Sequence, residues 1–127
     1  MKTTKKLGIW MDHSKAHLME FASSNFEIEI IKSKVDNQEK IESLARVNKS
    51  NFTTEQKQLF EYYKKIGETL KNYQRVILFG PTDAKIELFD ILSEDTRFLK
   101  IKIEIKNTDS MDENQQHNFV TNYFSKT

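Results

Sequence analysis

The chain has 127 residues, with 20 lysine and arginine residues against 19 aspartate and glutamate residues and a net charge of +1. With 37% hydrophobic and 31% charged residues, this composition predicts a single domain over residues 1–127, with one core and a charged surface. The near-neutral charge gives no whole-molecule argument for nucleic-acid binding, and the absence of cysteine excludes disulfides, thiolate metal sites and cysteine nucleophiles.

The start of the chain indicates where the protein works. The basic residues of Met1–Lys6 are followed by only five largely apolar residues, Leu7–Met11, which is too short for a secretory signal. No apolar run approaches the roughly 20 residues that span a bilayer. We therefore expect a cytoplasmic protein.

The first thirty residues predict three antiparallel strands. Leu7–Asp12 and His17–Phe21 alternate in polarity around the short polar stretch His13–Ala16, which is typical of a hairpin. Phe26–Ile30 follows as a third strand, with its apolar residues on one face and its two glutamates turned to solvent. The next stretch, Val35–Phe52, has the weakest pattern, and is either a solvated linker or a functional loop.

A long helix is expected over Thr53–Tyr73. Thr53 and Gln56 fit a capping box, and the apolar residues recur at helical spacing on one face, namely Leu59, Tyr63, Ile66, Leu70 and Tyr73. A lysine recurs every seven residues, at Lys57, Lys64 and Lys71. This stripe is either a solvated face or a surface for phosphates.

The remainder predicts two further strands and two helices. Val76–Phe79 is a buried strand that turns at Gly80-Pro81 into a helix over Asp83–Leu92, which Thr82 or Asp83 caps. Ile101–Lys106 alternates with charged residues as an edge strand does, and Ser110 with Glu113 fits the capping box of a final helix with a buried stripe of Phe119, Val120, Tyr123 and Phe124. The fold class is therefore α/β, with a mixed five-stranded sheet and helices on both faces, in the order that resembles ribonuclease H-like proteins.

Several stretches together resemble a known family, the central domain of archaeal and eukaryotic class I release factors and of their Pelota relatives. The chain is most similar to small bacterial single-domain members of this group, described as translational-machinery or host-attachment proteins. The similarity covers nearly the whole chain and rests on Leu7–Ala16, Thr53–Tyr73, Val76–Pro81 with Lys85 and Phe89, and Ile101–Asp109.

One difference from the family bears on activity. Release factors carry a Gly-Gly-Gln loop that triggers peptidyl-tRNA hydrolysis, and the corresponding segment here, Val35–Phe52, contains no glycine. Glycines allow backbone conformations that are closed to other residues. The resemblance therefore implies binding to the ribosome without hydrolytic release.

Two other site chemistries are compatible with parts of the sequence. A metal-dependent nuclease would use carboxylates at the ends of strands and on the long helix, for which the candidates are Asp12, Glu61 or Glu68, and Asp83. A weak metal site could form from Asp12, His13 and His17. Gly80-Pro81-Thr82-Asp83 lacks the glycines and lysine of a nucleotide loop, so no cofactor is expected. No resident metal is expected either.

The predicted function is thus that of a non-enzymatic, ribosome-associated protein. It would be an accessory component of the large subunit or a hibernation-type factor, with ribosomal RNA and neighbouring ribosomal proteins as partners. The alternative is a cytoplasmic adaptor that binds protein without contacting RNA. The residues expected to contact phosphates are Lys5, Lys6, His13, Lys15, Arg46, Lys49, Lys57 and Lys64.

Overall fold

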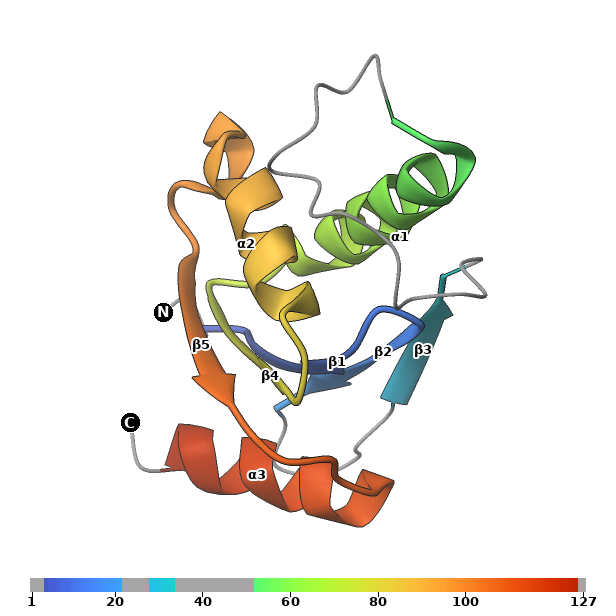
Figure 1. Cartoon of the computed structure of the whole chain (residues 1–127). Helices are drawn as coiled ribbons and strands as arrows, with labels where there is room; N and C mark the ends of the chain where they lie inside the picture. The colour runs from blue at the N-terminus through green and yellow to red at the C-terminus, as the bar shows by residue number, and fades with distance from the viewer. Residues whose placement is uncertain (1–3, 22–27, 34–51, 126–127) are drawn as a thin grey trace.

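The computed structural model describes residues 4–21, 28–33 and 52–125. Within these ranges the chain forms five strands, three α-helices and one 3₁₀ turn (Figure 1). In chain order they are β1 (Lys6–Met11), β2 (Lys15–Glu20), β3 (Ile28–Lys32), α1 (Thr54–Leu70), β4 (Arg75–Gly80), α2 (Ala84–Ser93), the turn Thr96–Phe98, β5 (Lys102–Asn107) and α3 (Glu113–Ser125).

The strands make one mixed sheet in the order β3-β2-β1-β4-β5. The pairs β1–β2 and β2–β3 are antiparallel, whereas β1–β4 and β4–β5 are parallel. Helices α1 and α2 cover one face and α3 lies alone on the other (Figure 1). The predicted α/β fold, with β5 at one edge, is confirmed.

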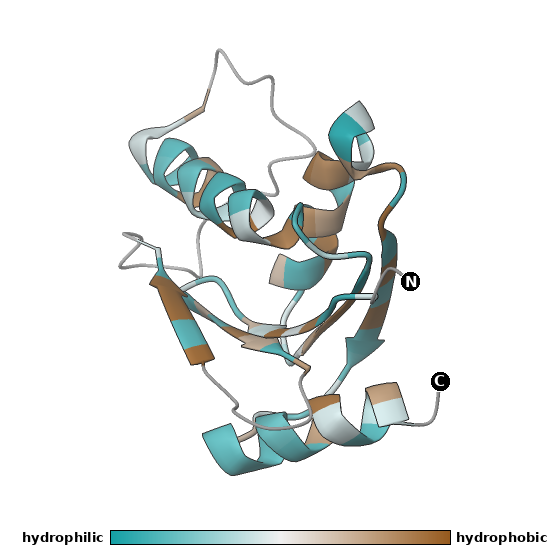
Figure 2. Cartoon of the chain, turned by 180° about the vertical axis from the view of Figure 1, so that it is seen from behind, coloured by the Kyte–Doolittle hydropathy of each residue, from teal (hydrophilic) through white to brown (hydrophobic). Residues whose placement is uncertain are grey.

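The two faces of the sheet carry separate cores, because successive residues of a strand point to opposite sides. In β1, Leu7, Ile9 and Met11 pack under α1 and α2, while Trp10 packs under α3. The apolar runs of the central strands therefore appear in Figure 2 between helices on both sides. No helix in the described residues is long and apolar enough to cross a membrane.

Helix starts agree with the sequence in one case and differ in another. The capping box at Thr53 and Gln56 is present, with each side chain accepting from the other residue's backbone N–H. For α3 the expected box at Ser110 and Glu113 is wrong. Asp112 and Gln115 make the same reciprocal bonds two residues later, at 2.8 and 3.0 Å.

Burial differs from the sequence expectation at several positions. Ile30 on the edge strand β3 is 47% exposed, whereas its neighbour Ile31 packs against the core beneath α1 and α2. Tyr73 lies beyond the end of α1 and is only partly buried, whereas Tyr62, which the expected apolar face did not include, is buried. Phe119 and Tyr123, expected in the buried stripe of the last helix, are likewise only partly buried, as is Phe89 of α2.

Candidate nucleic-acid interface

Three neighbouring parallel strands each open on a basic residue. Lys6 of β1 is in register with Arg75 of β4, and Arg75 is in register with Lys102 of β5. Adjacent strands lie about 4.8 Å apart, so three positive charges begin within roughly 10 Å of one another. We call Lys6, Arg75 and Lys102 the base row.

The base row lies on the face of the sheet that α3 covers. Lys6 Nζ stands 5.9 Å from the ring centre of Phe124 in the last turn of α3, and the Arg75 guanidinium stands 5.7 Å from the same ring. Lys6 Nζ is also 5.6 Å from the ring of Phe21. Cations over aromatic faces are stabilised by the ring quadrupole, which holds these two bases in place without neutralising them.

The carboxylate of Glu104 contacts the base row. Glu104 Oε1 lies 3.4 Å from Arg75 Nη2. A hydrogen bond from Tyr123, with the nearby charges of Lys102 and Arg75, holds the pKa of Glu104 below its usual range. Burial and the same hydrogen bond raise the pKa of Tyr123 to about 12. Like charges side by side on a sheet are unfavourable, and one carboxylate leaves three bases with a net positive charge.

Replacing Glu104 with glutamine is expected to strengthen binding to a polyanion about two- to fivefold, because a partly exposed ion pair of up to about 1 kcal/mol is removed. The measurement is the Kd for heparin or an RNA duplex at fixed salt and neutral pH. The wild-type Kd should approach that of the variant only as the pH falls through the lowered pKa of Glu104. Glu61→Gln, on the outer face of α1, is the control of equal charge change, and an equal gain there would refute the role of Glu104.

The predicted phosphate-binding residues do not form one surface. Lys5 and Lys6 lie at the base-row end of the sheet, where Lys5 is exposed with its Nζ 5.0 Å from the ring centre of Tyr73. His13 and Lys15 lie at the opposite end of β1, about 20 Å away at roughly 3.3 Å per residue. The amino terminus and the hairpin tip therefore lie at opposite ends of the sheet. Arg46 and Lys49 lie outside the described residues.

The lysine stripe of α1 is exposed but interrupted by acids. Lys57, Lys64 and Lys71 all face outward, and Glu61 and Glu68 lie between them on the same face. Lys71 Nζ is 2.6 Å from Glu68 Oε2, and this hydrogen bond lowers the pKa of Glu68. The outer face of α1 therefore alternates in sign along its length.

Polar side chains also meet at the carboxyl ends of β1 and β4, beneath α1 and α2. Asp12 Oδ1 accepts from the backbone N–H groups of Ser14 and Lys15, which fixes the hairpin turn. Tyr63 donates to Glu87 Oε1 at 2.6 Å, and the same oxygen lies 3.4 Å from His13 Nε2. Burial, and then the charge of Glu87, raise the pKa of Tyr63. These contacts tie the hairpin to both helices.

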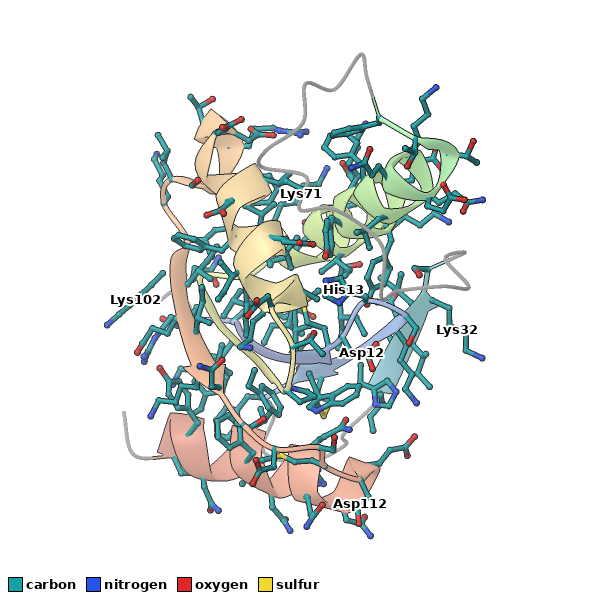
Figure 3. All side chains as sticks on the ribbon, in the orientation of Figure 1. Asp12, His13, Lys32, Lys71, Lys102 and Asp112 are labelled. Carbon is teal, nitrogen blue, oxygen red and sulfur yellow. The ribbon has the colours of Figure 1, made fainter. Side chains whose placement is uncertain are left out.

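The candidate residues for nuclease or metal chemistry do not come together in one site. His13 faces Glu87 on α2, whereas the His17 ring bonds Gln116 on α3 through Nδ1, so the two histidines point to opposite faces. Glu61 and Glu68 face outward from α1, and Asp83 is exposed before α2. In the part of the chain that the structure describes, no three histidine, aspartate or glutamate side chains are placed to hold a metal ion. Figure 3 labels Asp12 and His13 at this end of the sheet.

Sequence reasoning missed Arg75 and Lys102 because they are 69 and 96 residues from Lys6 along the chain. One signal was available, since Lys6, Arg75 and Lys102 each open one of the strands that the fold makes parallel and adjacent. Parallel strands begin at the same edge of a sheet, so basic residues at their starts become neighbours. Using this signal requires knowing which strands are neighbours in the sheet. The order of elements along the chain suggests this but does not state it.

Comparison with known proteins finds similarity at the level of the fold. No family model and no curated protein matches the sequence. Among solved structures, Thermoplasma acidophilum Pelota aligns with 93% of this chain at a TM-score of 0.59 and 17% identity, and Archaeoglobus fulgidus Pelota aligns with 98% at 0.60 and 10%. The archaeal translation termination factor aRF1 aligns with 96% of the chain at 0.54 and 17%.

The chain spans about a third of the length of these Pelota proteins, 32% and 34%, and 39% of the length of aRF1. One further match is described as an archaeal Pelota bound to the ribosome, with a TM-score of 0.56 and 19% identity. At identities this low the likeness concerns architecture and not the residues of a site. The chain therefore has the fold of one domain of the Pelota and archaeal release-factor translation proteins.

Proposed function

We propose that the protein is a non-enzymatic, ribosome-associated factor that binds ribosomal RNA through the base row. The observation that carries the proposal is the register of Lys6, Arg75 and Lys102 on adjacent strands, with the carboxylate of Glu104 beside them. Clustered lysine and arginine side chains contact phosphates and give RNA affinity that does not depend on sequence. The fold shared with translation factors supports the ribosome as the source of that RNA.

The absence of enzymatic release belongs to the same proposal. Release factors need glycines in the loop that corresponds to residues 35–52, and this segment has none. A protein that docks without cleaving fits an accessory component of the large subunit or a factor bound to idle ribosomes. Cytoplasmic localisation follows from the proposal.

The test is co-sedimentation with ribosomes on sucrose gradients over a salt series. Lys6→Glu/Lys102→Glu should weaken binding about 10- to 100-fold near 100 mM salt and reduce the salt slope by about two, one unit for each lost phosphate contact. The variant Lys57→Glu/Lys64→Glu changes the net charge equally on the other side of the sheet. Because acids already interrupt that stripe, it should keep most of the binding.

Each remaining outcome counts against the proposal. Equal losses in both variants would show a general charge effect in place of a defined site. Wild-type protein that stays at the top of the gradient at low salt, from growing and from starved cells, would remove the ribosome as partner.

One observation favours the alternative adaptor function. Asp83, Glu87, Asp90 and Glu94 recur at helical spacing along α2, and the last three line a groove of about 840 Å³ between α1 and α2. Aromatic rings of Phe52, Phe60 and Phe98 also line it. Lys64 and Arg97 also line the groove, but five acidic side chains outnumber them. The groove therefore suits a basic protein segment better than RNA, and it is where a protein partner would bind if the base-row variants leave function intact.

A further inference from the structure

The outer face of α3 differs in chemistry from those of the other two helices. Asn114, Asn118 and Asn122 fall four residues apart, and all three are exposed. They lie directly opposite the buried stripe of Gln116, Val120 and Phe124. We call Asn114, Asn118 and Asn122 the asparagine stripe.

An asparagine stripe is unfavourable for the helix itself. Asparagine has a low helix propensity compared with alanine, lysine or glutamate, because its side chain competes for backbone hydrogen bonds. The exposed positions of α1 are mostly lysine and glutamate, and those of α2 are Ile86, Asp90 and Ser93. Three uncharged amides at four-residue spacing on α3 therefore favour a role in binding a ligand.

A second cluster of basic side chains, a pair of lysines, lies at the other end of the same face. Lys15 of β2 and Lys32 of β3 are directly opposite in register, and both are exposed. Lys15 Nζ is 6.0 Å from the ring centre of Trp10, which packs under α3, and Lys32 alternates with Ile28, which packs in the same cluster. We call Lys15 and Lys32 the lysine pair.

Helix α3 runs from the lysine-pair end of the sheet to the base row. Near its start Gln116 bonds His17, the β2 residue two positions after Lys15, with 2.8 Å between Gln116 Oε1 and His17 Nδ1. At its end Phe124 lies under Lys6 and Arg75. In Figure 3, Lys102 and Lys32 point away from the protein on opposite sides, with α3 below the sheet.

We propose that an RNA helix lies along α3, with phosphates on the base row and the lysine pair and with ribose hydroxyls on the asparagine stripe. This rests on the proposed RNA-binding function and names the form of RNA and its path. The carboxamide both donates and accepts hydrogen bonds, as does the 2′-hydroxyl, and the wide minor groove of an RNA helix displays these hydroxyls.

The dimensions and charges suit this arrangement. The two basic clusters are separated by about 20 Å along the strands, and the stripe spans about 12 Å at 1.5 Å per helical residue. Among the described residues, the carboxylates on or beside this face include Glu104, Asp109, Asp112 and Glu113, with Asp12 next to Lys15. Glu104 pairs with Arg75, Asp112 Oδ1 accepts from the Gln115 N–H, and Asp12 Oδ1 accepts from the Lys15 N–H, so three of these five are engaged. The ammonium group of Lys106 lies over the Tyr123 ring and adds a further positive charge.

The test compares a 12-base-pair RNA duplex with the DNA duplex of the same sequence. Asn114→Ala/Asn118→Ala/Asn122→Ala should weaken RNA binding about tenfold and leave DNA binding unchanged, because only RNA offers the 2′-hydroxyl. The same variant should melt at a higher temperature, since alanine favours the helix. A weaker RNA complex from a more stable protein cannot be explained by unfolding.

The lysine pair is tested separately. Lys15→Glu/Lys32→Glu should weaken both duplexes about tenfold and lower the salt slope by about two. If the lysines serve only to keep an edge strand from pairing with other molecules, Kd and slope stay at wild-type values and the proposed path along α3 is wrong.

The outcomes separate this inference from the proposed function. If Lys6→Glu/Lys102→Glu abolishes RNA binding while the asparagine and lysine-pair variants bind normally, the base row stands and the path along α3 fails. If the asparagine variant loses RNA and DNA equally, the stripe does not contact ribose and the inference fails. If the wild-type protein binds neither duplex, both proposals fail.

Discussion

Gly80→Ala is expected to reduce the free energy of unfolding by about 3 kcal/mol or more. Gly80 ends β4 with a φ of +144°, a region that is essentially restricted to glycine and costs other residues on the order of 1–3 kcal/mol. An added Cβ would also press against the carbonyl oxygen of Met11 on the neighbouring strand. Because both obstacles are backbone, no side-chain rotation can relieve them.

The measurement is urea unfolding of wild type and variant with a common slope, so that the shift in midpoint gives the change in stability. Gly67→Ala is the matched control, because its Cβ would meet side-chain atoms of Leu92 at 3.2 Å and Phe98 at 3.4 Å. These side chains can adjust, and alanine gains roughly 1 kcal/mol of helix propensity. A Gly80→Ala protein as stable as Gly67→Ala would contradict the strained turn.

Gly8→Ala is expected to cost about 2 kcal/mol, in the range found for overpacked cores. Gly8 lies in β1 beneath α3, and a Cβ there would overlap the side chain of Val120. The variant must push α3 away from the sheet, which loosens the core formed by Trp10, Ile77 and Phe124.

A substitution at Val120 should partly restore the stability that Gly8→Ala removes. Val120→Ala alone should also destabilise, through the cavity left by its methyl groups. Combined with Gly8→Ala, it should cost at least 1 kcal/mol less than the sum of the two single changes, since the added methyl fills the space that the other loses. Strict additivity in the double-mutant cycle would show that α3 does not contact β1 at Gly8.

Gly8 links the stability of the fold to the proposed function. Gly8 sets how closely α3 approaches the sheet, and α3 connects the base row to the lysine pair through Phe124 and Gln116. A variant that shifts α3 should therefore move the asparagine stripe relative to both basic clusters, which lie on the strands.

Much of the architecture was readable from local patterns. Apolar alternation located the strands of the hairpin, and the long helix was recognised from its capping box at Thr53 and its four-residue apolar spacing. The order of elements then restricted the topology, because crossovers between parallel strands are right-handed. The predictions that were wrong depended on neighbours. Ile30 alternates like a core residue yet lies on an edge strand where it remains 47% exposed.

Lys85 shows the same limit inside the protein. A lysine in the first turn of a helix is expected at the surface, yet Lys85 is fully buried and donates to the carbonyl of Thr82. Desolvation lowers its pKa. The helix pattern placed this residue correctly on α2, and only the packing of α2 against the end of β4 buried it.

The sequence by itself determined the element types, the capping of α1 and the assignment to an α/β sheet, because these depend on residues a few positions apart. Only the tertiary structure decided which charges become neighbours. It separated His13 and Lys15 from Lys6 by the length of a strand, and it brought Arg75 and Lys102 beside Lys6 across 69 and 96 residues of chain. The strength of a charged surface depends on distance in space, and strand order, which no local pattern contains, sets that distance here.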